Sequence, residues 1–461
     1  MTRIHTCFGA LVLFTVAILA APAPVCANSV FDRDMSFGDQ GRADVWFDAG
    51  QQNQDTARML LRRPDGDIDV VAQIQTAVAG KYGVGLQRVT PAGVKVGAPR
   101  IVANVALIYV SDAVRASNGK IVVLGARVSD ADNTKVAVVV MRFNADYSDD
   151  TGFDGIGWRS YDIVDSGIQR SASPLSIASL ASGDIFVVGE ASTDVTWGLK
   201  LVLAENGSVR RSCSADNTLR YSSVAVAAST RAGSADDAVL AANQGLSVNL
   251  LMHDSADNPS CIASGAQISV DVASMCPHPG NPAPNQVDPI LLRGNDASSS
   301  TASFLVATGT RVQGSSARAA VIDVDLDAAA ALQTRSASCG LGPVATTRIA
   351  QSDDRQHVFL TGWRCRDCGN GNVDNATAAL KRNGSALIAY PAPLPFNGVP
   401  GFQRLTSFFA ISLDRMPVLA TPGQSASFVL AGTRTLTNGT DDDVVLTRHA
   451  LVAAMFENGL E

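Results

Sequence analysis

A unit of turns and apolar runs recurs along almost the whole chain. Each copy has a polar turn with Gly or Asp, an apolar run that usually ends in Gly, a polar loop and a second apolar run. The first apolar run of each copy ends 52 to 70 residues after that of the copy before it. These ends fall near Gln73, Gly125, Gly189, Ala242, Gly309, Gly362 and Gly432. The pattern of each copy is constant while the spacing between copies varies, as loop insertions of different length would produce.

The apolar runs are typical of β-strands. The runs "KIVVLG" and "VAVVVMRF" are short, rich in β-branched residues and bounded by turn residues. Seven units, each with room for four short strands, predict an all-β fold: a seven-bladed β-propeller that forms one domain over residues 28–461. One blade cannot cover both its own faces, so neighbouring blades must cover them.

One phrase occurs twice, more than a hundred residues apart. The stretch "MRFNADYSDDTGFDGIGW" has Asp150 three residues before Phe153, and "VFDRDMSFGDQGRADVWF" has Asp34 three residues before Phe37. The last unit stops after its third strand, "DDVVLTRHALVAAMF", so it lacks an outer strand. We therefore predict that residues 30–47 supply that strand and close the ring, which removes the open strand edges.

The same residues resemble the delta-60 repeat family of exported bacterial proteins. The matching positions are Asn118-Gly119, Gly125, Arg142-Phe143-Asn144 and Asp150, together with Phe37-Gly38 near the N-terminus. The resemblance is strongest over two units. It implies an exported bacterial protein, in which we expect the Asn-x-Ser/Thr sequences to be unglycosylated.

The first residues read as a secretory signal peptide over residues 1–27. Arg3 precedes an apolar run from Phe8 to Ala21 that is short for a membrane span, and Val25-Cys26-Ala27 suits cleavage after Ala27. A lipoprotein reading of Cys26 is the alternative. We expect an exported protein, periplasmic or extracellular, without a membrane span.

Six cysteines follow the predicted signal. An even number in an exported chain predicts structural disulfides, and six cysteines allow fifteen pairings. The candidates are Cys213, Cys261, Cys276, Cys339, Cys365 and Cys368. The last two form a C-x-x-C, for which a redox or zinc role is the alternative to a loop disulfide.

The charge pattern argues against nucleic acid as a partner. Loss of Arg3 with the signal would change the net charge from −7 to −8, and basic residues form no cluster. We expect a monomer without cofactor, whose partner is a protein or a cell-envelope glycan.

Motifs that could carry chemistry have simpler structural interpretations. The alternating Asp323, Asp325 and Asp327 mimic a calcium loop but lack its Gly and Glu, and the run Asp441–Asp443 fits a hairpin tip. The four histidines that follow the predicted signal are scattered, and the tryptophans could stack sugars or pack between blades. These residues are His253, His278, His357 and His449, and Trp46, Trp158, Trp197 and Trp363.

No catalytic or metal-binding residue can be assigned from the motifs. The leading hypothesis is a binding or scaffold protein that uses loops on one face of the ring. The alternative is an extracytoplasmic hydrolase with carboxylates that converge at the central channel. A structural surface protein without a small ligand is a third possibility.

Overall fold

The structure is a computed structural model, and all its regular secondary structure in the described residues is β-strand. It describes residues 31–47, 54–192, 196–213, 224–228, 237–244, 247–254, 267–271, 286–287, 291–294, 302–311, 318–326, 332–338, 345–352, 354, 356–367, 372–383, 386–389, 394–395, 418–421, 427–435 and 442–451.

Within these residues the strands form seven antiparallel sheets of four or five strands, which we number in chain order. Sheet 1 holds β3 (Thr56–Arg62), β4 (Ile68–Gln75), β5 (Tyr82–Val89) and β6 (Lys95–Leu107). Sheet 2 holds β7 (Tyr109–Arg115), β8 (Ile121–Val128), β9 (Val136–Phe143) and β10 (Trp158–Tyr161). Sheet 3 holds β11 (Ile163–Asp165), β12 (Ile168–Ser179), β13 (Ile185–Ser192), β14 (Thr196–Leu203) and β15 (Val209–Cys213).

The remaining sheets complete the chain. Sheet 4 holds β16 (Val224–Ala228), β17 (Asp237–Gln244), β18 (Ser247–Asp254) and β19 (Gln267–Asp271). Sheet 5 holds β20 (Gln286–Val287), β21 (Leu291–Gly294), β22 (Ala302–Arg311), β23 (Arg318–Leu326) and β24 (Leu332–Ser338). Sheet 6 holds β25 (Ala345–Gln351), β26 (His357–Asp367), β27 (Asn372–Asn383), β28 (Ala386–Ala389) and β29 (Leu394–Pro395). Sheet 7 holds β30 (Val418–Ala420), β31 (Ser427–Thr435), β32 (Asp442–Leu451), β1 (Phe31–Arg33) and β2 (Arg42–Val45).

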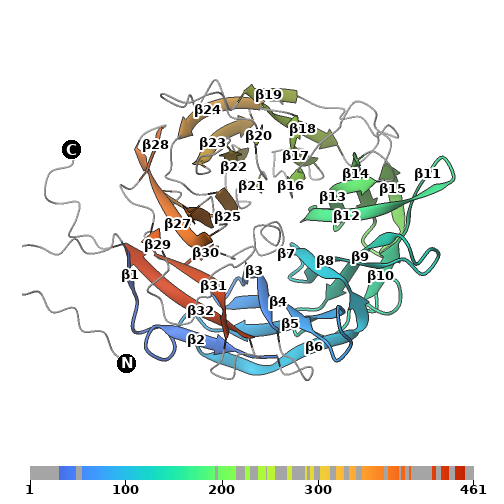
Figure 1. The fold of residues 1–461 in the computed structure, drawn as a ribbon, viewed down its shortest axis with the longest axis horizontal. Helices are drawn as coiled ribbons and strands as arrows, with labels where there is room; N and C mark the ends of the chain where they lie inside the picture. Colours follow the sequence, from blue (N-terminus) through green and yellow to red (C-terminus); the bar gives the residue numbers. More distant parts are fainter. Residues whose placement is uncertain are drawn as a thin grey trace, which may run out of the picture.

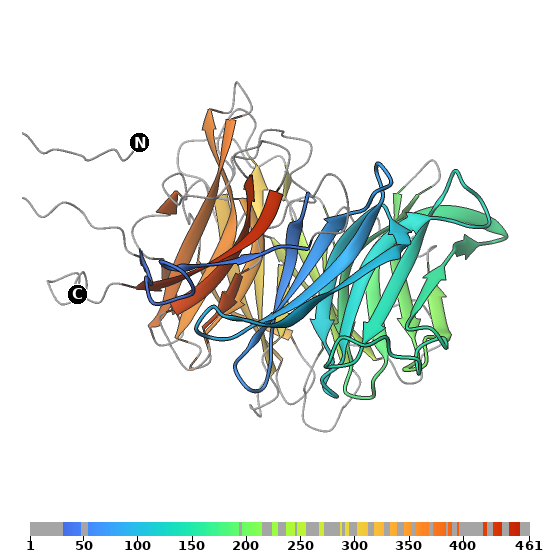
Figure 2. The ribbon, with the colours of Figure 1, turned by 90° about the horizontal axis from the view of Figure 1, so that it is seen from below.

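The sheets stand side by side around a ring, as in a β-propeller. Figure 1 shows the strands that come early in each sheet, such as β3, β7 and β25, nearest the centre, with β6, β10 and β15 toward the outside. Figure 2 shows the same ring from the side, with the sheets packed face against face. This arrangement explains why the unit must recur, because each sheet is covered only by its neighbours.

The two ends of the chain meet in sheet 7. Both N-terminal strands pair with β32, with Phe31 opposite Leu451 and Arg42 opposite Thr447. The N-terminal outer strand predicted from the sequence is therefore present. Its side chains Phe37, Val45 and Phe47 are fully buried in a cluster with residues of sheets 1 and 7.

The core lies between sheets rather than within them. The interior strands β4, β8 and β13 are buried on both faces over most of their length. One buried cluster joins sheets 7 and 1, a second joins sheets 1 and 2, and a third joins sheets 2 and 3. Continuous apolar strands are what this double coverage requires.

A β-bulge recurs in the inner strands and explains the Gly that ends the apolar run. In β3, β7, β12 and β25 the pairing skips one residue, and the partners beside the skip are Ala72, Gly125, Gly189 and Gly362. The bulge brings the inner strand close, so a Cβ on Gly125 would lie 2.8 Å from the Tyr109 carbonyl oxygen.

Replacement of Gly189 by Ala is expected to destabilise the fold. The new Cβ would lie 2.8 Å from Pro174 Cα, which is backbone that can move only with its strand. The expected loss is about 1–3 kcal/mol, measured as a lower thermal or urea midpoint. Gly152→Ala is the control, because a Cβ there meets only the tip of the Asp150 side chain, at 3.2 Å. Equal midpoints for the two variants would refute the close approach.

Candidate functional site

Three turns, which follow β5, β9 and β14, share one backbone conformation. They are Thr90–Gly93 in sheet 1, Asn144–Tyr147 in sheet 2 and Ala204–Gly207 in sheet 3. In each turn the fourth residue donates its N–H to the carbonyl of the first, at 2.9 Å. The fourth residue has a positive φ of 82° at Gly93, 69° at Tyr147 and 84° at Gly207. The turns are thus equivalent positions of the repeat, although one of them holds a Tyr where Gly is favoured.

The N-terminal phrase fastens sheet 7 to the turn of sheet 1. Arg448 on β32 binds the Asp34 carboxylate through Nε at 2.8 Å, lies 5.3 Å from the centre of the Phe37 ring and donates to the Pro91 carbonyl at 2.7 Å. Gly38 N–H donates to the Ala92 carbonyl at 2.7 Å. Hydrogen bonds from Ser36, joined by Arg448, lower the pKa of Asp34.

The internal phrase repeats this contact between sheets 2 and 3. Arg142 on β9 binds Asp150, lies 5.1 Å from the centre of the Phe153 ring and donates to the Glu205 carbonyl. Asp154 N–H donates to the Asn206 carbonyl at 3.1 Å. The repeated Asp and Phe of the two phrases therefore form the same fastening between sheets, with Arg448 and Arg142 at its centre.

Lys120 adds a second cation to the internal fastening, at 2.9 Å from the Asp150 carboxylate. Burial alone would raise the pKa of Asp150, but the bonds from Lys120 and Arg142 outweigh it and hold that pKa below its usual value. The carboxylate thus stays ionised and holds both cations.

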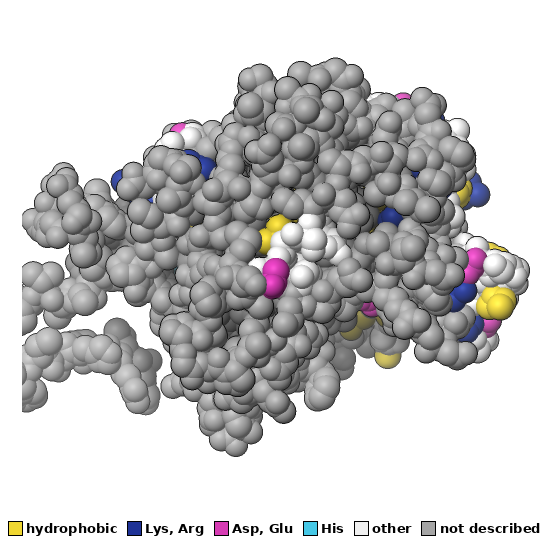
Figure 3. Space-filling model, turned by 90° about the horizontal axis from the view of Figure 1, so that it is seen from above, with side chains coloured by type: hydrophobic (Ala, Val, Ile, Leu, Met, Phe, Trp, Pro, Cys, Tyr) yellow, Lys and Arg dark blue, Asp and Glu magenta, His cyan; other side chains and the backbone are white. Residues whose placement is uncertain are grey.

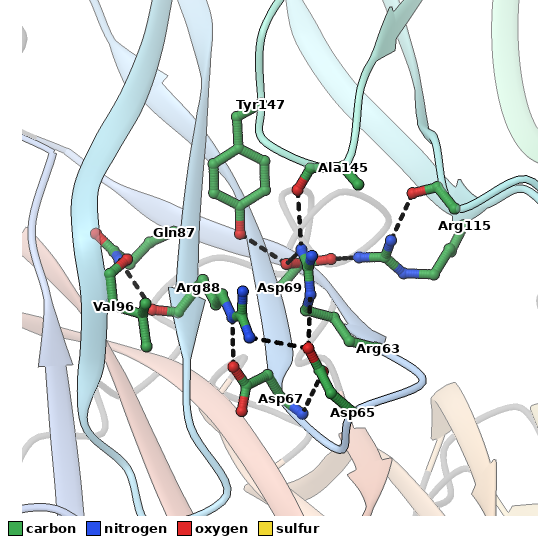
Figure 4. A network of polar contacts seen from close by, with 11 residues as sticks. Arg63, Asp65, Asp67, Asp69, Gln87, Arg88, Val96, Arg115, Ala145 and Tyr147 are labelled. Carbon is green, nitrogen blue, oxygen red and sulfur yellow. Dashed lines mark hydrogen bonds and ion pairs between the residues drawn. The ribbon is translucent and has the colours of Figure 1, made fainter.

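Between sheets 1 and 2 a different network takes this place. Figure 4 shows Arg63, Arg115 and Tyr147 converging on the Asp69 carboxylate. Asp69 is fully buried; it pairs with Arg63 at 3.0 Å and with Arg115, and it accepts the Tyr147 hydroxyl at 2.6 Å. Arg63 also donates to the Ala145 carbonyl at 3.1 Å. Ala145 is the second residue of its turn, as Pro91 and Glu205 are of theirs. Arg63, in the connection between β3 and β4, therefore makes the contact that Arg448 and Arg142 make from a strand at the other two junctions.

The chain compensates locally for this change. Arg88, on β5, is the counterpart of Arg142 and Arg448, and it pairs with Asp65 at 2.8 Å and with Asp67. Asp67 stands where sheet 2 has Lys120, the residue after the Gly of the first hairpin. Burial raises the pKa of Tyr147 to about 12 and lowers the pKa of Arg115. A neutral phenol therefore donates to Asp69 at physiological pH, and we assign the network a structural role.

A groove lies beside this network. It has a volume of about 420 Å³ and is lined by Ala98, Pro99 and Arg100 of β6 and by residues 146–149 of the turn in sheet 2. Arg100 pairs with Asp149 across it at 3.0 Å. Its volume is within the range of small-ligand and peptide sites.

The inner strands bring polar side chains together at the ring centre. Arg348 of sheet 6 reaches Asp112 of sheet 2 at 3.5 Å, and both are buried. Asp112 also accepts Ser176 Oγ at 3.0 Å and Ile177 N–H at 3.2 Å from sheet 3. Asp112, Ser176 and Arg348 each follow the bulge of their strand directly, so the repeated bulge aims them at this region.

A second polar contact joins sheets 1 and 2. The side-chain amide oxygen of Gln73 accepts a hydrogen bond from the Arg58 guanidinium at 3.0 Å and one from the Val110 N–H at 2.9 Å. Glu190 occupies the corresponding position of β13, five residues after the start of its strand. Burial raises the pKa of Glu190 to about 7. At slightly acid pH the Glu190 carboxyl group is therefore mostly protonated, and it is uncharged like the Gln73 amide.

Replacement of Glu190 by Gln is expected to stabilise the protein at neutral and alkaline pH but not near pH 4. Its folded pKa lies above the unfolded value, so wild-type stability falls as pH rises from about 4.5 through about 7. Because the side chain keeps some solvent contact, we expect a gain of about 1–2 kcal/mol at about pH 8 and none near pH 4. Thermal midpoints of both proteins across this range measure the effect. A gain that does not change with pH would contradict it.

Most residues singled out in the sequence do not gather here. Cys213 lies at the end of β15 and Cys365 in β26, while Cys261, Cys276, Cys339 and Cys368 lie outside the described residues. The disulfides therefore stay a prediction. Asp323 and Asp325 lie in β23 and His253 in β18, and Asp327, Asp441 and His278 lie outside the described residues. In the part of the chain that the structure describes, no three His, Cys, Asp or Glu side chains lie where they could hold a metal ion.

Four of the histidines and tryptophans have described side chains: His357, His449, Trp46 and Trp158. His357 and His449 are buried, and His449 stacks on Phe428 with 5.5 Å between ring centres. Trp46 is 46% exposed and carries Lys95 over its ring at 3.3 Å. Trp158 packs partly buried against the cluster of sheets 1 and 2, and Trp197 and Trp363 lie in β14 and β26.

The sequence interpretation missed the Asp69 network and the ion pair of Asp112 with Arg348 near the ring centre. A signal existed for the first: Asp65, Asp67 and Asp69 alternate after Arg62-Arg63, and a strand that starts with charge in a buried run needs partners. None existed for the second, because its members lie in different copies of the repeat.

One projecting element is apolar at its surface. The hairpin of β11 and β12 exposes Val164 (55%) and Ile168 (57%), and Arg170 pairs with Asp165 beside them. Figure 3 shows hydrophobic, basic and acidic side chains together at the edge of the molecule where this hairpin projects. Among the described stretches, no helix has the length and hydropathy that a membrane crossing needs.

No family model and no curated protein sequence matches the chain. Solved structures with a similar fold include the polysaccharide lyase Uly1, at 8% identity and TM-score 0.45, covering 90% of this chain and 93% of that one. The β-propeller domain of the Trilobed protease from Pyrococcus furiosus has 8% identity and TM-score 0.41, over 87% and 98%. The WD40 domain of SCAP from fission yeast has 8% identity and TM-score 0.37, over 88% and 98%. At these scores the likeness adds nothing to what the strand pairing shows.

Proposed function

We propose that the chain is an exported seven-bladed β-propeller of the delta-60 repeat type that acts as a binding or scaffold protein. It engages a protein or a cell-envelope glycan through loops on one face of the ring. One observation carries this proposal: among the described residues near the ring centre, the Asp112 carboxylate is bound by Arg348, Ser176 and the Ile177 N–H. Such a group holds different sheets of the ring together.

A hydrolase that uses two carboxyl groups makes a different demand on the centre. It needs one carboxyl group of raised pKa and a second carboxylate about 5–9.5 Å away, both open to substrate. Glu190, whose pKa is raised to about 7, is the described residue that favours this alternative. Its position argues against it, since the corresponding Gln73 bonds one sheet to the next. We therefore assign Glu190 to packing.

The test is a thermal-unfolding screen of the purified protein. It would be run with calcium, zinc, a chelator, and a panel of envelope oligosaccharides, because any ligand of the native form raises the midpoint by mass action. A rise with one oligosaccharide, together with unchanged oligosaccharide length after incubation, supports glycan binding. Cleavage of the oligosaccharide that is lost in Glu190→Gln would replace the proposal with the hydrolase. No rise with any of them moves the proposal to a protein partner.

Export is the second part of the proposal, and it rests on the N-terminal sequence. Expressed with residues 1–27 in a bacterium, the chain is expected outside the cytoplasm with Asn28 as its first residue. Mass spectrometry of the fractionated protein reads the cleavage site directly. Intact protein in the cytoplasm would refute export without touching the binding proposal.

A further inference from the structure

The carbonyl of the third turn residue receives a donor at two of the three described junctions between sheets. The Ala92 carbonyl accepts the Gly38 N–H at 2.7 Å, and the Asn206 carbonyl accepts the Asp154 N–H at 3.1 Å. In both cases the donor belongs to a loop of the preceding sheet in the ring. The fold thus uses this carbonyl as a docking point for the backbone of a turn, since Gly38 and Asp154 both have positive φ.

At the junction of sheets 1 and 2 the corresponding carbonyl is that of Asp146. No described residue donates a hydrogen bond to it. Sheet 1 has no Phe-Gly loop, and its outer strand β6 has only a bulge of residues 97–99, where the pairing jumps from Val96 to Arg100. The groove lined by Ala98, Pro99 and residues 146–149 lies between that bulge and the turn. It is where the other junctions hold a loop.

The apolar part of the fastening is already supplied at this junction. A Cβ on Gly93 or Gly207 would lie 3.2 Å or 3.0 Å from the Phe37 or Phe153 ring of the preceding sheet. Tyr147 holds this position in sheet 2, and its own ring runs inward to Asp69. An occupant of the groove therefore needs no Phe. The contact still missing among the described residues of this junction is a backbone N–H that donates to the Asp146 carbonyl.

The charge of the groove selects the occupant further. Asp146 and Asp149 line it together with one cation, Arg100, which pairs with Asp149. The Asp146 carboxylate is fixed by Ser148, whose N–H and hydroxyl donate to it at 3.0 Å and 2.7 Å. A fixed carboxylate without a cation of its own in the groove favours a basic side chain.

We propose that the groove between sheets 1 and 2 binds a turn-forming polypeptide segment of a partner protein. The segment donates a backbone N–H to the Asp146 carbonyl and places a Lys or Arg beside the Asp146 carboxylate. It takes the place that the Phe37 and Phe153 loops hold at the other junctions. This inference rests on the proposed binding function and assigns it a partner class and a site.

The probe is a labelled octapeptide based on the chain's own loop. It has the sequence of residues 150–157 with Asp150→Lys, Phe153→Ala and Asp154→Lys, and a second peptide with only Phe153→Ala keeps the acidic residues. Fluorescence anisotropy with the purified protein measures the dissociation constant. We expect saturable binding of the basic peptide and at least about tenfold weaker binding of the acidic one.

Variants locate the binding. Ala98→Trp fills the groove from an exposed position of β6 and is expected to weaken the basic peptide at least about tenfold. Asp146→Asn removes an exposed charge and is expected to weaken it by up to about fivefold, the range for an exposed ion pair. Asp132→Asn is the matched control, because Asp132 accepts the N–H and hydroxyl of Thr134 in the same way at a distant turn. It should leave the affinity unchanged, and all variants should keep the wild-type melting temperature.

Several results would overturn the inference. One is no saturable binding of the basic peptide, or binding that Ala98→Trp does not change. Another is an oligosaccharide whose binding Ala98→Trp abolishes while the peptide does not bind, which would leave the proposed binding function intact and change the class of ligand. Ligand-induced stabilisation that no groove variant alters would likewise retain the function and remove this site.

Discussion

A chain that begins at Asp55 is expected to unfold about 5–10 °C below a chain that begins at Val30. The segment between them holds β1, β2 and the side chains of Phe37, Val45 and Phe47, all fully buried. Burial of three such side chains contributes roughly 5–9 kcal/mol, which is a large part of the stability of a typical domain. The shorter chain also leaves β32 as an open edge and Arg448 without Asp34.

The comparison is made by thermal unfolding of both chains at one protein concentration. The chain from Val30 is the control, because it lacks the N-terminal residues but retains the whole closing segment. Light scattering should rise for the shorter chain, since the uncovered edge of β32 can pair with another copy. Equal melting temperatures would show that the ring holds without its N-terminal strand.

The repeat predicted the fold because its signal is carried by short-range patterns. The "KIVVLG" run contains both the strand and the Gly that faces the bulge, so a single copy is enough to predict the geometry of its sheet. The two Asp-x-x-Phe phrases are also short patterns, and their similarity predicted that the N-terminal segment closes the ring. Even the weak later copies fall on sheets 4 to 7, although their endings lack Phe-Gly.

The contacts between sheets could not be predicted in the same way. Asp69 takes Arg115 and Tyr147 from the next copy of the repeat, and Arg348 reaches Asp112 across two intervening sheets of the ring. Such pairs have no fixed spacing. Tyr147 shows the difficulty most clearly, because it stands where the other turns have Gly, and only the structure shows that its ring replaces a Phe from the neighbouring sheet.

Replacement of Asp69 by Asn is expected to cost about 3–5 kcal/mol, the range for a broken buried ion pair. Asn keeps the size and an acceptor for the Tyr147 hydroxyl but leaves Arg63 and Arg115 without their shared carboxylate. Two buried guanidinium groups then face each other at the junction of sheets 1 and 2. The measurement is the shift of the urea midpoint.

Asp149→Asn is the control for this effect. Asp149 also pairs with an arginine, Arg100, at 3.0 Å, but both side chains are more than 40% exposed. An exposed pair is worth about 0–1 kcal/mol, because solvent screens it and both chains lose freedom. If the two variants shift the midpoint equally, burial does not set the strength of the Asp69 network. If Asp69→Asn alone destabilises, the junction that borders the groove is held by buried charge, where the neighbouring junctions use a loop from the preceding sheet.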